Sequence, residues 1–400
     1  MRPFAGRRVL LGVTGGIASY KTTWLARLLH KAGAEVDVVL SRSAREFVGA
    51  VTFEALTGRP VHTELIASGH ALDHIKLARD AHAIVVAPVT ADFLARAAHG
   101  NADDLLSAVL LAAEAPVLFV PAMNDKMWAH KQTQANVERC CEIGYNVLPP
   151  DTGDLAAGEG AGPGRMPEPE TIFAHVGRML EKQSLAGRRV VVTAGPTREP
   201  LDPVRFLSNR SSGKMGVAIA ASAWRRGATV ALLHGPLEVA LPVGPRQVPA
   251  ETTAQLRDAV ADELPNADAL IMAAAPADFS PVDVADSKIK KSNAPDSLAL
   301  AQTPDILADT RKLRRNGSVI VGFALETENA VENARAKIAS KALDAIVVNN
   351  AREPGAGFGV DTNRVTLVFA DGKTEPLPLM SKDDVADQLL DRVEAMLNGR

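Results

Sequence analysis

The chain has few of the features that would place it outside the cell or in a membrane. Its 400 residues include only two cysteines, Cys140 and Cys141, which are adjacent and cannot build a disulfide framework. We therefore expect a reducing, cytoplasmic location. The early apolar run VLLGV is too short for a signal peptide and leads into glycines. The longest apolar stretch, LLSAVLLAAEAP, is far shorter than a membrane span.

The chain also lacks a large charge of either sign. Its 47 acidic and 44 basic residues give a net charge of −3, so we expect no nucleic-acid or membrane partner. Two short basic runs, KIKK (288–291) and RKLRR (311–315), are interpreted first as solvated faces. A composition that is 46% hydrophobic and 23% charged permits large cores, and the length suggests two or three domains.

The same opening pattern occurs twice. Residues 6–16 read GRRVLLGVTGG and residues 187–196 read GRRVVVTAGP, each a basic pair, an apolar run and a glycine turn. The helical patterns SYKTTWLARLLHKAG and GKMGVAIAASAWRRG follow, and then the apolar runs AEVDVVLS and ATVALLHG. These are βαβ units, and their nearly continuous apolar strands favour parallel sheets covered on both faces. The sequence therefore predicts an α/β chain of two doubly wound domains, 1–183 and 184–400.

Further apolar runs extend each predicted sheet. They are AIVVAP and PVLFVPAMN in the first half, and ALIMAAAP, SVIVGFALE, DAIVVNN and RVTLVFADG in the second. The segment PEPETIFAHVGRMLEKQ is expected to form the helix that closes the first half. Ligands of open α/β sheets bind at the carboxyl ends of the strands. The candidate sites are therefore TGG, PVTAD and PAMND, then AGPTREP, AAAPADF, GFALET and NN.

Two common nucleotide motifs are missing. GVTGGIASYK is not G-x-G-x-x-G, which disfavours a nicotinamide dehydrogenase, but its small residues leave backbone N–H groups open for a monophosphate such as that of FMN. LSNRSSGKMG (207–216) ends like a P-loop. However, Ser208 stands where a P-loop needs glycine, and Met215 stands where it needs serine or threonine. The remaining interpretation is an anion site at the start of a helix, without the loop that surrounds the phosphates in a P-loop.

Two histidines, His70 and His74, are spaced as neighbours on one helix face. This spacing suits a metal-binding pair, but no third ligand is evident. A structural histidine, buried or on the surface, is the alternative for each.

The order of the motifs resembles a known family. GVTGGIASYKT, DHIKLARDAHAIVVAPVTADFLARAAHGNADDLLS, PAMNDKMW and GAGPGRMPEP are similar to the flavin-dependent cysteine decarboxylases. TAGPTREPLDPVRFLSNRSSGKMG, KIKK, TPDIL, GFALET and ARAKIASKALDAIVVNN are similar to their ligase fusion partner. Over about residues 5–395, the chain resembles the bifunctional phosphopantothenoylcysteine decarboxylase/phosphopantothenate–cysteine ligases of bacterial coenzyme A synthesis.

For the first half, the resemblance implies FMN as cofactor. His74 would be the catalytic base and Asn124 would hold the substrate carboxylate. Oxidation of the CH2–SH carbon to a thioaldehyde creates the electron sink that loss of CO2 requires, and the flavin carries this redox step. Neutral imidazole suits the proton removal. The residues that would line the flavin and its phosphate are Gly15, Gly16, Ile17, Ser41, Pro88, Thr90 and Asp92.

One residue that the resemblance implies is missing. The family usually carries a cysteine in the glycine-rich flap before GRM, where it is thought to protonate the intermediate, but this chain has Ala157. Asp154, Glu159 or water would then supply the proton. Cys140 and Cys141 lie in a predicted helix, QANVERCCEIGY, and are interpreted as packing residues. The alternative function is a CTP-dependent ligase whose first half is only a flavin-binding assembly module.

For the second half, the resemblance implies that CTP converts 4'-phosphopantothenate into an acyl-cytidylate, from which the cysteine amine displaces CMP. Asn209 would bind the acyl-cytidylate, Arg205 would support the loop or a phosphate, and Ser211 and Ser212 would contact the substrate. Two anions that meet need positive charge in the transition state. Lys288, in a polar segment rich in turn-forming residues, would supply it.

The remaining nucleotide contacts follow from the same resemblance. Lys337 and Lys341 are four residues apart on one helix and would both reach the triphosphate, although a solvated lysine stripe is the alternative. Mg2+ would bridge the phosphates. The family also implies a homo-oligomer, a dodecamer of flavin-domain trimers and ligase-domain dimers. The other expected nucleotide contacts are Ala273, Ala274, Asp278, Pro304, Asp305, Ile306, Leu307 and Phe323.

Overall fold

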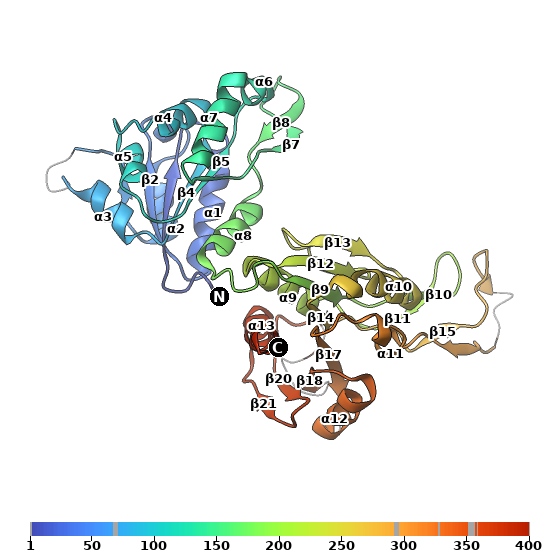
Figure 1. Cartoon of the computed structure of the whole chain (residues 1–400). Helices are drawn as coiled ribbons and strands as arrows, with labels where there is room; N and C mark the ends of the chain where they lie inside the picture. The colour runs from blue at the N-terminus through green and yellow to red at the C-terminus, as the bar shows by residue number, and fades with distance from the viewer. Residues whose placement is uncertain are drawn as a thin grey trace. The chain divides into compact units, whose positions relative to one another are not determined.

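The computed structural model describes residues 2–66, 71–291, 296–326, 329–350, 357 and 359–399. The chain forms two compact units, Met1–Glu181 and Lys182–Arg400, so the division falls just before the predicted boundary at 183/184. Each unit has its own sheet with helices on both faces (Figure 1), which confirms the predicted doubly wound α/β class. Among the described helices, none has both the length and the apolar composition that crossing a membrane requires.

Within its described residues, unit 1 has a six-stranded parallel sheet in the order β3-β2-β1-β4-β5-β6. The order reverses between β1 and β4, which is where a doubly wound sheet opens its ligand crevice. A separate hairpin, β7–β8, follows the sheet. The strands are β1 (Arg8–Val13), β2 (Glu35–Leu40), β3 (Val61–His62), β4 (Ala83–Val89), β5 (Val117–Pro121), β6 (Asn146–Val147), β7 (Asp151–Asp154) and β8 (Ala161–Arg165).

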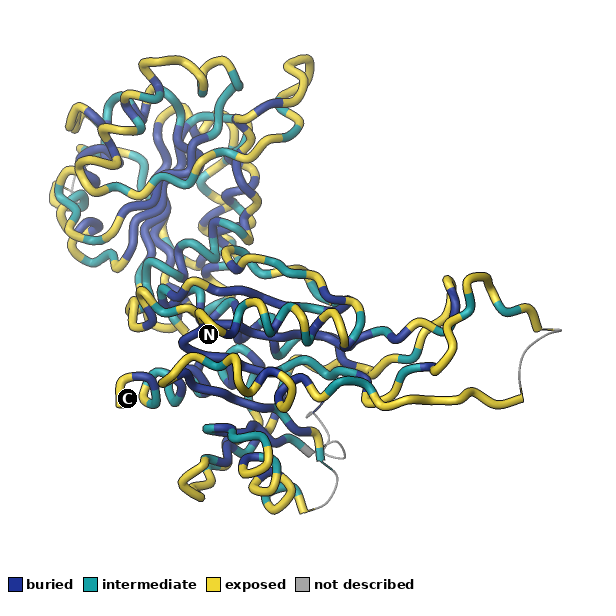
Figure 2. Tube along the Cα trace, turned by 45° about the vertical axis from the view of Figure 1, so that its right-hand side comes forward, coloured by how far each residue is buried: buried dark blue, intermediate teal, exposed yellow. Residues whose placement is uncertain are grey.

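The sheet of unit 1 separates two hydrophobic cores. Val9 and Leu11 pack on the side of the first and last helices, and Leu10 packs on the opposite side. Figure 2 shows the buried strands running through the middle of the unit. The helices are α1 (Ser19–Lys31), η1 (Ser43–Glu46), α2 (Ala50–Thr57), α3 (Asp73–Asp80), α4 (Ala91–Ala98), α5 (Leu105–Leu111), α6 (Asp125–Ala129), α7 (Lys131–Glu142) and α8 (Pro169–Leu180).

Unit 2 has an eight-stranded sheet within its described residues, in the order β13-β12-β9-β14-β17-β18-β20-β21. Its strands from β13 to β18 are parallel, but β20 runs antiparallel to both neighbours, so the prediction of a parallel sheet is wrong at this edge. An Asp371–Gly372 turn joins β20 to β21 as a hairpin, and Gly372 has a φ of +88°. The sheet strands are β9 (Arg189–Ala194), β12 (Thr229–His234), β13 (Arg246–Pro249), β14 (Ala269–Met272), β17 (Val319–Glu326), β18 (Ala345–Asn350), β20 (Val365–Phe369) and β21 (Thr374–Pro376).

Two short ribbons extend from the carboxyl edge of this sheet and contact each other, β10–β11 and β15–β16 (Figure 1). Helices α9 and α13 pack together on one face of the sheet, where Ser222 Oγ donates to the buried carboxylate of Asp387. The remaining elements are β10 (Arg198–Pro200), β11 (Phe206–Ser208), β15 (Phe279–Pro281), β16 (Leu300–Gln302), β19 (Thr362–Asn363), β22 (Met380–Ser381), α9 (Lys214–Arg225), α10 (Thr253–Glu263), η2 (Leu264–Asn266), α11 (Ile306–Asp309), η4 (Arg311–Leu313), α12 (Ala330–Lys341) and α13 (Lys382–Asn398).

Candidate active sites

The loops after β1 and β4 are joined by one hydroxyl group. Thr14 Oγ1 donates to Pro88 O at 2.7 Å and accepts from Thr90 N at 3.1 Å. The glycine turn that follows Thr14 leads into α1, and Ser19 Oγ donates to Gly16 O at 2.5 Å. The predicted residues on the two loops are therefore held at the crevice where the strand order reverses.

Glycine 15 of this turn has no room for a side chain. A Cβ on Gly15 would lie 2.4 Å from Ser43 Cβ, whereas a Cβ on Gly16 would have its nearest neighbour, Pro88 Cγ, at 3.9 Å. Ser41 Oγ lies 3.4 Å from Ser43 Oγ, so hydroxyl groups lie beside the turn. This small, hydroxyl-bearing cradle at the start of a helix fits the phosphate of FMN.

We expect Gly15→Ala to weaken FMN binding about ten- to a hundredfold, because an overpacked methyl group displaces Ser43 and deforms the cradle at a cost of about 1–3 kcal/mol. Fluorescence titration of the deflavinated protein with FMN measures this change. Gly49→Ala is the control, since a Cβ there would meet nothing closer than 3.9 Å. Parental affinity in Gly15→Ala would contradict the placement of the phosphate.

The other predicted flavin contacts lie at the same edge but differ in exposure. Thr90 caps α4 by accepting a hydrogen bond from Phe93 N at 3.2 Å, and Asp92 is exposed in the first turn of that helix. Ile17 has 66% of its surface exposed. These positions can contact a ligand without any rearrangement of the core.

Asn124 lies between the sheet and the flap hairpin. It caps α6, with its Oδ1 accepting from Lys126 N at 2.9 Å, which leaves the side-chain amide to donate to a carboxylate. Strand β8 of the flap packs on this segment, because Met123 N donates to Gly164 O at 3.0 Å. A Cβ on Gly164 would lie 2.1 Å from Met123 O, so only glycine allows this approach.

Ala157 lies exposed at the tip of the β7–β8 hairpin. The carboxyl groups of Asp154 and Glu159 are exposed in the same hairpin and are the acids nearest to it in sequence. Cys140 is buried, and burial raises the pKa of its thiol to about 11, so it packs in the core as expected. Cys141 is exposed on α7.

His74 lies on α3, half-buried at a mainly apolar pocket of about 480 Å³. Its Nδ1 is buried and has no hydrogen-bond partner among the described residues. His70, its proposed metal partner, lies outside the described residues, and no cluster of three metal-ligating side chains occurs within them. None of the predicted flavin contacts lines this pocket, whose walls are Leu65, Ile66, Ala71, His74, Ile75, Ala102, Ala108, Leu111 and Ala112.

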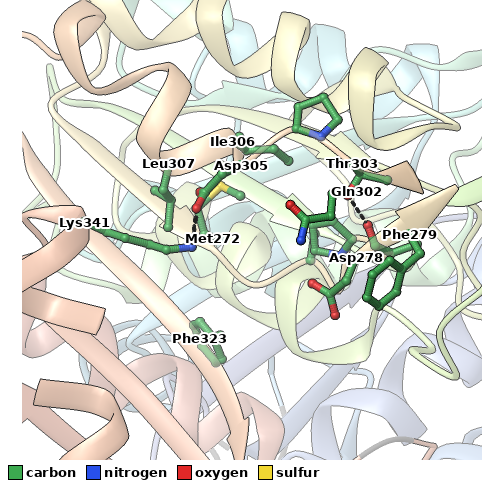
Figure 3. A pocket seen from close by; sticks show the side chains of 14 residues that line it. Met272, Asp278, Phe279, Gln302, Thr303, Asp305, Ile306, Leu307, Phe323 and Lys341 are labelled. Carbon is green, nitrogen blue, oxygen red and sulfur yellow. Dashed lines mark hydrogen bonds and ion pairs between the residues drawn. The ribbon is translucent and has the colours of Figure 1, made fainter. Parts of the chain in front are cut away.

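A second pocket, of about 420 Å³, lies in unit 2 beyond the carboxyl end of β14. Lys341 reaches Asp305 on one side, and Asp278 and Phe279 lie on the other (Figure 3). Most of the predicted nucleotide contacts line it: Ala274, Asp278, Pro304, Asp305, Ile306, Leu307, Phe323 and Lys341. Three do not, namely Ala273, Lys288 and Lys337.

Six lining residues were not predicted individually, although Pro276, Ala277 and Phe279 lie in the predicted site segment AAAPADF. Gln302 and Thr303 directly precede the predicted Pro304, and Phe279 directly follows the predicted Asp278, so chain proximity alone would have found them. Met272 ends strand β14, and Pro276 and Ala277 follow in the loop at the carboxyl end of that strand. The full set is Met272, Pro276, Ala277, Phe279, Gln302 and Thr303.

The two predicted lysines of α12 have different partners. Lys341 Nζ lies 3.0 Å from Asp305 Oδ2 inside the pocket. Lys337 Nζ donates to Glu326 Oε1 at 2.7 Å, outside it, and this hydrogen bond holds the pKa of Glu326 below its usual range. The structure therefore brings only Lys341 to the pocket.

Asn209 connects the pocket to the loop that follows β11. Its Nδ2 donates to Pro276 O at 2.9 Å and to Ala275 O at 3.2 Å, and Pro276 lines the pocket. Two residues later the chain becomes buried at Ser211 and Ser212, just before α9. The structure therefore places Asn209 beside the pocket and buries the two serines, whose predicted contact with the substrate stays a prediction.

Comparisons with known proteins cover both units. Residues 2–181 match the family model Flavoprotein, and residues 185–397 match the model DNA/pantothenate metabolism flavoprotein C-terminal domain. The "Coenzyme A biosynthesis bifunctional protein CoaBC" of Mycolicibacterium smegmatis is 45% identical over 412 residues, 99% of each chain. The protein of the same name from Bacillus subtilis is 42% identical and covers 98% of this chain and 97% of its own. A crystal structure of the C-terminal domain of a protein with that name covers 55% of this chain and 100% of its own, with 36% identity and a TM-score of 0.47.

Proposed function

The chain belongs to the family of bifunctional coenzyme A biosynthesis proteins, and from that premise we propose which residues perform its two reactions. It is a phosphopantothenate–cysteine ligase and a phosphopantothenoylcysteine decarboxylase, with FMN as the cofactor of the decarboxylase. The matches span both units, so the ligase-only alternative has no support. The pocket of unit 2 supports the assignment of residues, since predicted nucleotide contacts from four separate segments line it.

In the ligase reaction, the pocket of unit 2 takes the nucleotide, for which we propose CTP. Phe323 packs against it, Asp278 contacts its polar edge and Lys341 meets its phosphates. The carboxylate of 4'-phosphopantothenate attacks the α-phosphorus, and pyrophosphate leaves. Asn209 holds the resulting acyl-cytidylate while the amine of cysteine displaces CMP, loses a proton and forms the amide. Lys288 offsets the charge of the two anions that meet in the first step.

Magnesium completes the nucleotide site in this proposal. The ion would offset the negative charge of the triphosphate when the carboxylate attacks. Mass analysis of the products from phosphopantothenate, cysteine and Mg2+ with CTP or ATP tests the ligase assignment. Equal turnover with both nucleotides would contradict the proposed preference for CTP.

Lys341→Met is expected to raise the KM for CTP about tenfold, because a hydrogen bond from a charged group contributes about 1.5–3 kcal/mol and part of it goes to Asp305. Lys337→Met is the matched control on the same helix, since Lys337 pairs with Glu326 outside the pocket. Initial rates at varied CTP concentrations give the KM for CTP of each variant. A larger KM change for Lys337→Met would reverse the assignment and restore the predicted role of Lys337.

In the decarboxylase reaction, the cradle of unit 1 fits FMN, which when bound supplies the redox chemistry that loss of CO2 requires. We propose that Gly15, Gly16 and Ser41 hold its phosphate. Asn124 donates its side-chain amide to the substrate carboxylate. His74, whose buried Nδ1 lacks a protein partner among the described residues, accepts the proton from the substrate.

Ala157→Cys is expected to leave phosphopantetheine formation unchanged or to raise it. A methyl group cannot donate the final proton, and removal of one positioned acid costs about 10²–10⁴-fold, so a carboxyl group of Asp154 or Glu159, or water, sustains a slower reaction. Anaerobic mixing with phosphopantothenoylcysteine, followed through the flavin absorbance and the products, measures each half-reaction. If the flavin stays oxidised and no CO2 appears, the decarboxylase mechanism proposed for this chain fails.

We also propose a cytoplasmic homo-oligomer that binds only small molecules. The adjacent free cysteines agree with a reducing compartment. The start of α1 exposes apolar surface at Tyr20 (60%) and Trp24 (43%), which agrees with burial against other copies. Light scattering of the FMN-loaded protein tests the dodecamer that the family implies, and a monomer would contradict it.

A further inference from the structure

A buried carboxylate, Asp202, organises the loop between β10 and β11. Its side chain has no exposed surface. Its Oδ1 accepts hydrogen bonds from the backbone N–H groups of Val204 and Arg205, both at 2.8 Å, and its Oδ2 accepts from Arg205 Nε at 3.0 Å. Asp202 and Arg205 therefore form one rigid ion pair within a single turn of the chain.

This ion pair also binds the backbone of Ile289 at two points. Ile289 N donates to Asp202 Oδ2 at 3.1 Å, and Arg205 Nη2 donates to Ile289 O at 2.6 Å. Ala285 N, earlier in the same segment, donates to Leu201 O at 3.1 Å. The segment that carries KIKK is thus attached through its main chain, and the side chain of Lys288 remains exposed.

The attachment limits where Lys288 can lie. The peptide bond between Lys288 and Ile289 includes the nitrogen atom that Asp202 binds, and neighbouring Cα atoms are only about 3.8 Å apart. The four-carbon lysine side chain therefore reaches outward from a fixed base. Strand β11, which begins one residue after Arg205, leads directly to Asn209, so the same ribbon holds both proposed ligase groups.

The opposite charges of Asp202 and Arg205 suit a pair that holds the segment of Lys288 in place. Arg205 neutralises Asp202, so the buried carboxylate does not cancel the positive charge that Lys288 is proposed to bring to the reaction. The guanidinium holds the pKa of Asp202 well below its usual range, so its contribution is lost only when the pH falls through that lowered pKa. The attachment is therefore constant across neutral pH. Two of the three nitrogens of Arg205 are already engaged, which favours support of the loop over direct binding of a phosphate.

We propose that Asp202, together with Arg205, is a positioning residue for the ligase reaction, which holds the backbone at Ile289 so that Lys288 meets the two reacting anions. This inference rests on the role of Lys288 proposed above. It assigns Asp202 no contact with substrate. Replacing Asp202 should therefore slow the step that Lys288 accelerates, and it should have no such effect once Lys288 has been removed.

Asp202→Asn tests the attachment with almost no change in volume. The amide oxygen can still accept from Val204 N and Arg205 N, but its NH2 group would face Ile289 N–H and the guanidinium, which are all donors. We expect pyrophosphate release to slow about 10²-fold, the cost typical of a displaced reacting group. The flavin absorbance should stay near that of the parent, because the flavin belongs to unit 1. Asp268→Asn is the control, because Asp268 is a buried carboxylate that pairs with Arg315 just before β14, at the opposite end of that strand from the pocket.

The double variant separates positioning from folding. If Asp202 acts through Lys288, adding Asp202→Asn to Lys288→Gln should slow pyrophosphate release by less than about threefold, whereas independent effects would multiply. Multiplied losses, or a fully active Asp202→Asn beside a slow Lys288→Gln, would overturn the inference while the role of Lys288 stands. A fully active Lys288→Gln would instead overturn that role and the inference with it.

Discussion

Asn209→Asp is expected to slow amide formation by at least about 10³-fold, beyond the usual cost of one lost donor in a reacting site. The side-chain amide of Asn209 donates to Ala275 O and Pro276 O. A carboxylate would instead place negative charge against those two carbonyl oxygens and against the phosphate of the acyl-cytidylate. Product formation from phosphopantothenate, CTP and cysteine measures the loss.

The flavin absorbance of Asn209→Asp should be unchanged, because the flavin belongs to unit 1. Asn266→Asp is the matched control, since it adds the same charge at an exposed position of η2. Normal ligase turnover in Asn209→Asp would remove Asn209 from the reaction. A loss of turnover in both variants would point to charge alone.

His74→Asn is expected to slow decarboxylation about 10²–10⁴-fold, the contribution of a positioned general base. The substrate should then fail to bleach the flavin band under anaerobic conditions, although the ligase rate stays at the parental value. His74 has two features of such a base. Its buried Nδ1 lacks a protein partner among the described residues, and the residue lines a mainly apolar pocket.

His99→Asn is the control for His74→Asn. His99 follows α4 and is exposed, with its Nδ1 2.7 Å from Ala95 O. Bleaching of the flavin at the parental rate in His74→Asn would show that His74 is a packing histidine, which was the alternative interpretation of its spacing from His70.

The strands and both units follow from local sequence signals. Apolar runs of the length of a buried strand, each followed by glycine or polar residues, occur at β1, β4, β9 and β14, and the structure has strands there. Strand direction does not follow from such runs. The run at β20 reads like the others, yet its hairpin with β21 makes that edge antiparallel. The Asp371–Gly372 turn is the sequence signal that distinguishes this antiparallel strand from the parallel ones.

The candidate sites were less predictable where partners lie far apart in the sequence. Asp202 and Ile289 are 87 residues apart, and the bond uses a backbone N–H, which every residue except proline provides. No pattern of residue types marks such a contact. The position of Lys337 outside the pocket was unpredictable for a related reason. Its spacing from Lys341 predicts a shared helix face, but Glu326 on β17 binds it elsewhere.

The contact between α9 and α13 bears on the order in which the protein can fold during its synthesis. All the strands of unit 1 precede residue 182, so its core can close while unit 2 is still being made. Unit 2 cannot do the same, because Ser222 on its first helix meets Asp387, 165 residues later. Until α13 leaves the ribosome, the part of α9 that packs against α13 stays uncovered. We therefore expect nascent chains that end before Lys382 to be the ones that chaperones retain.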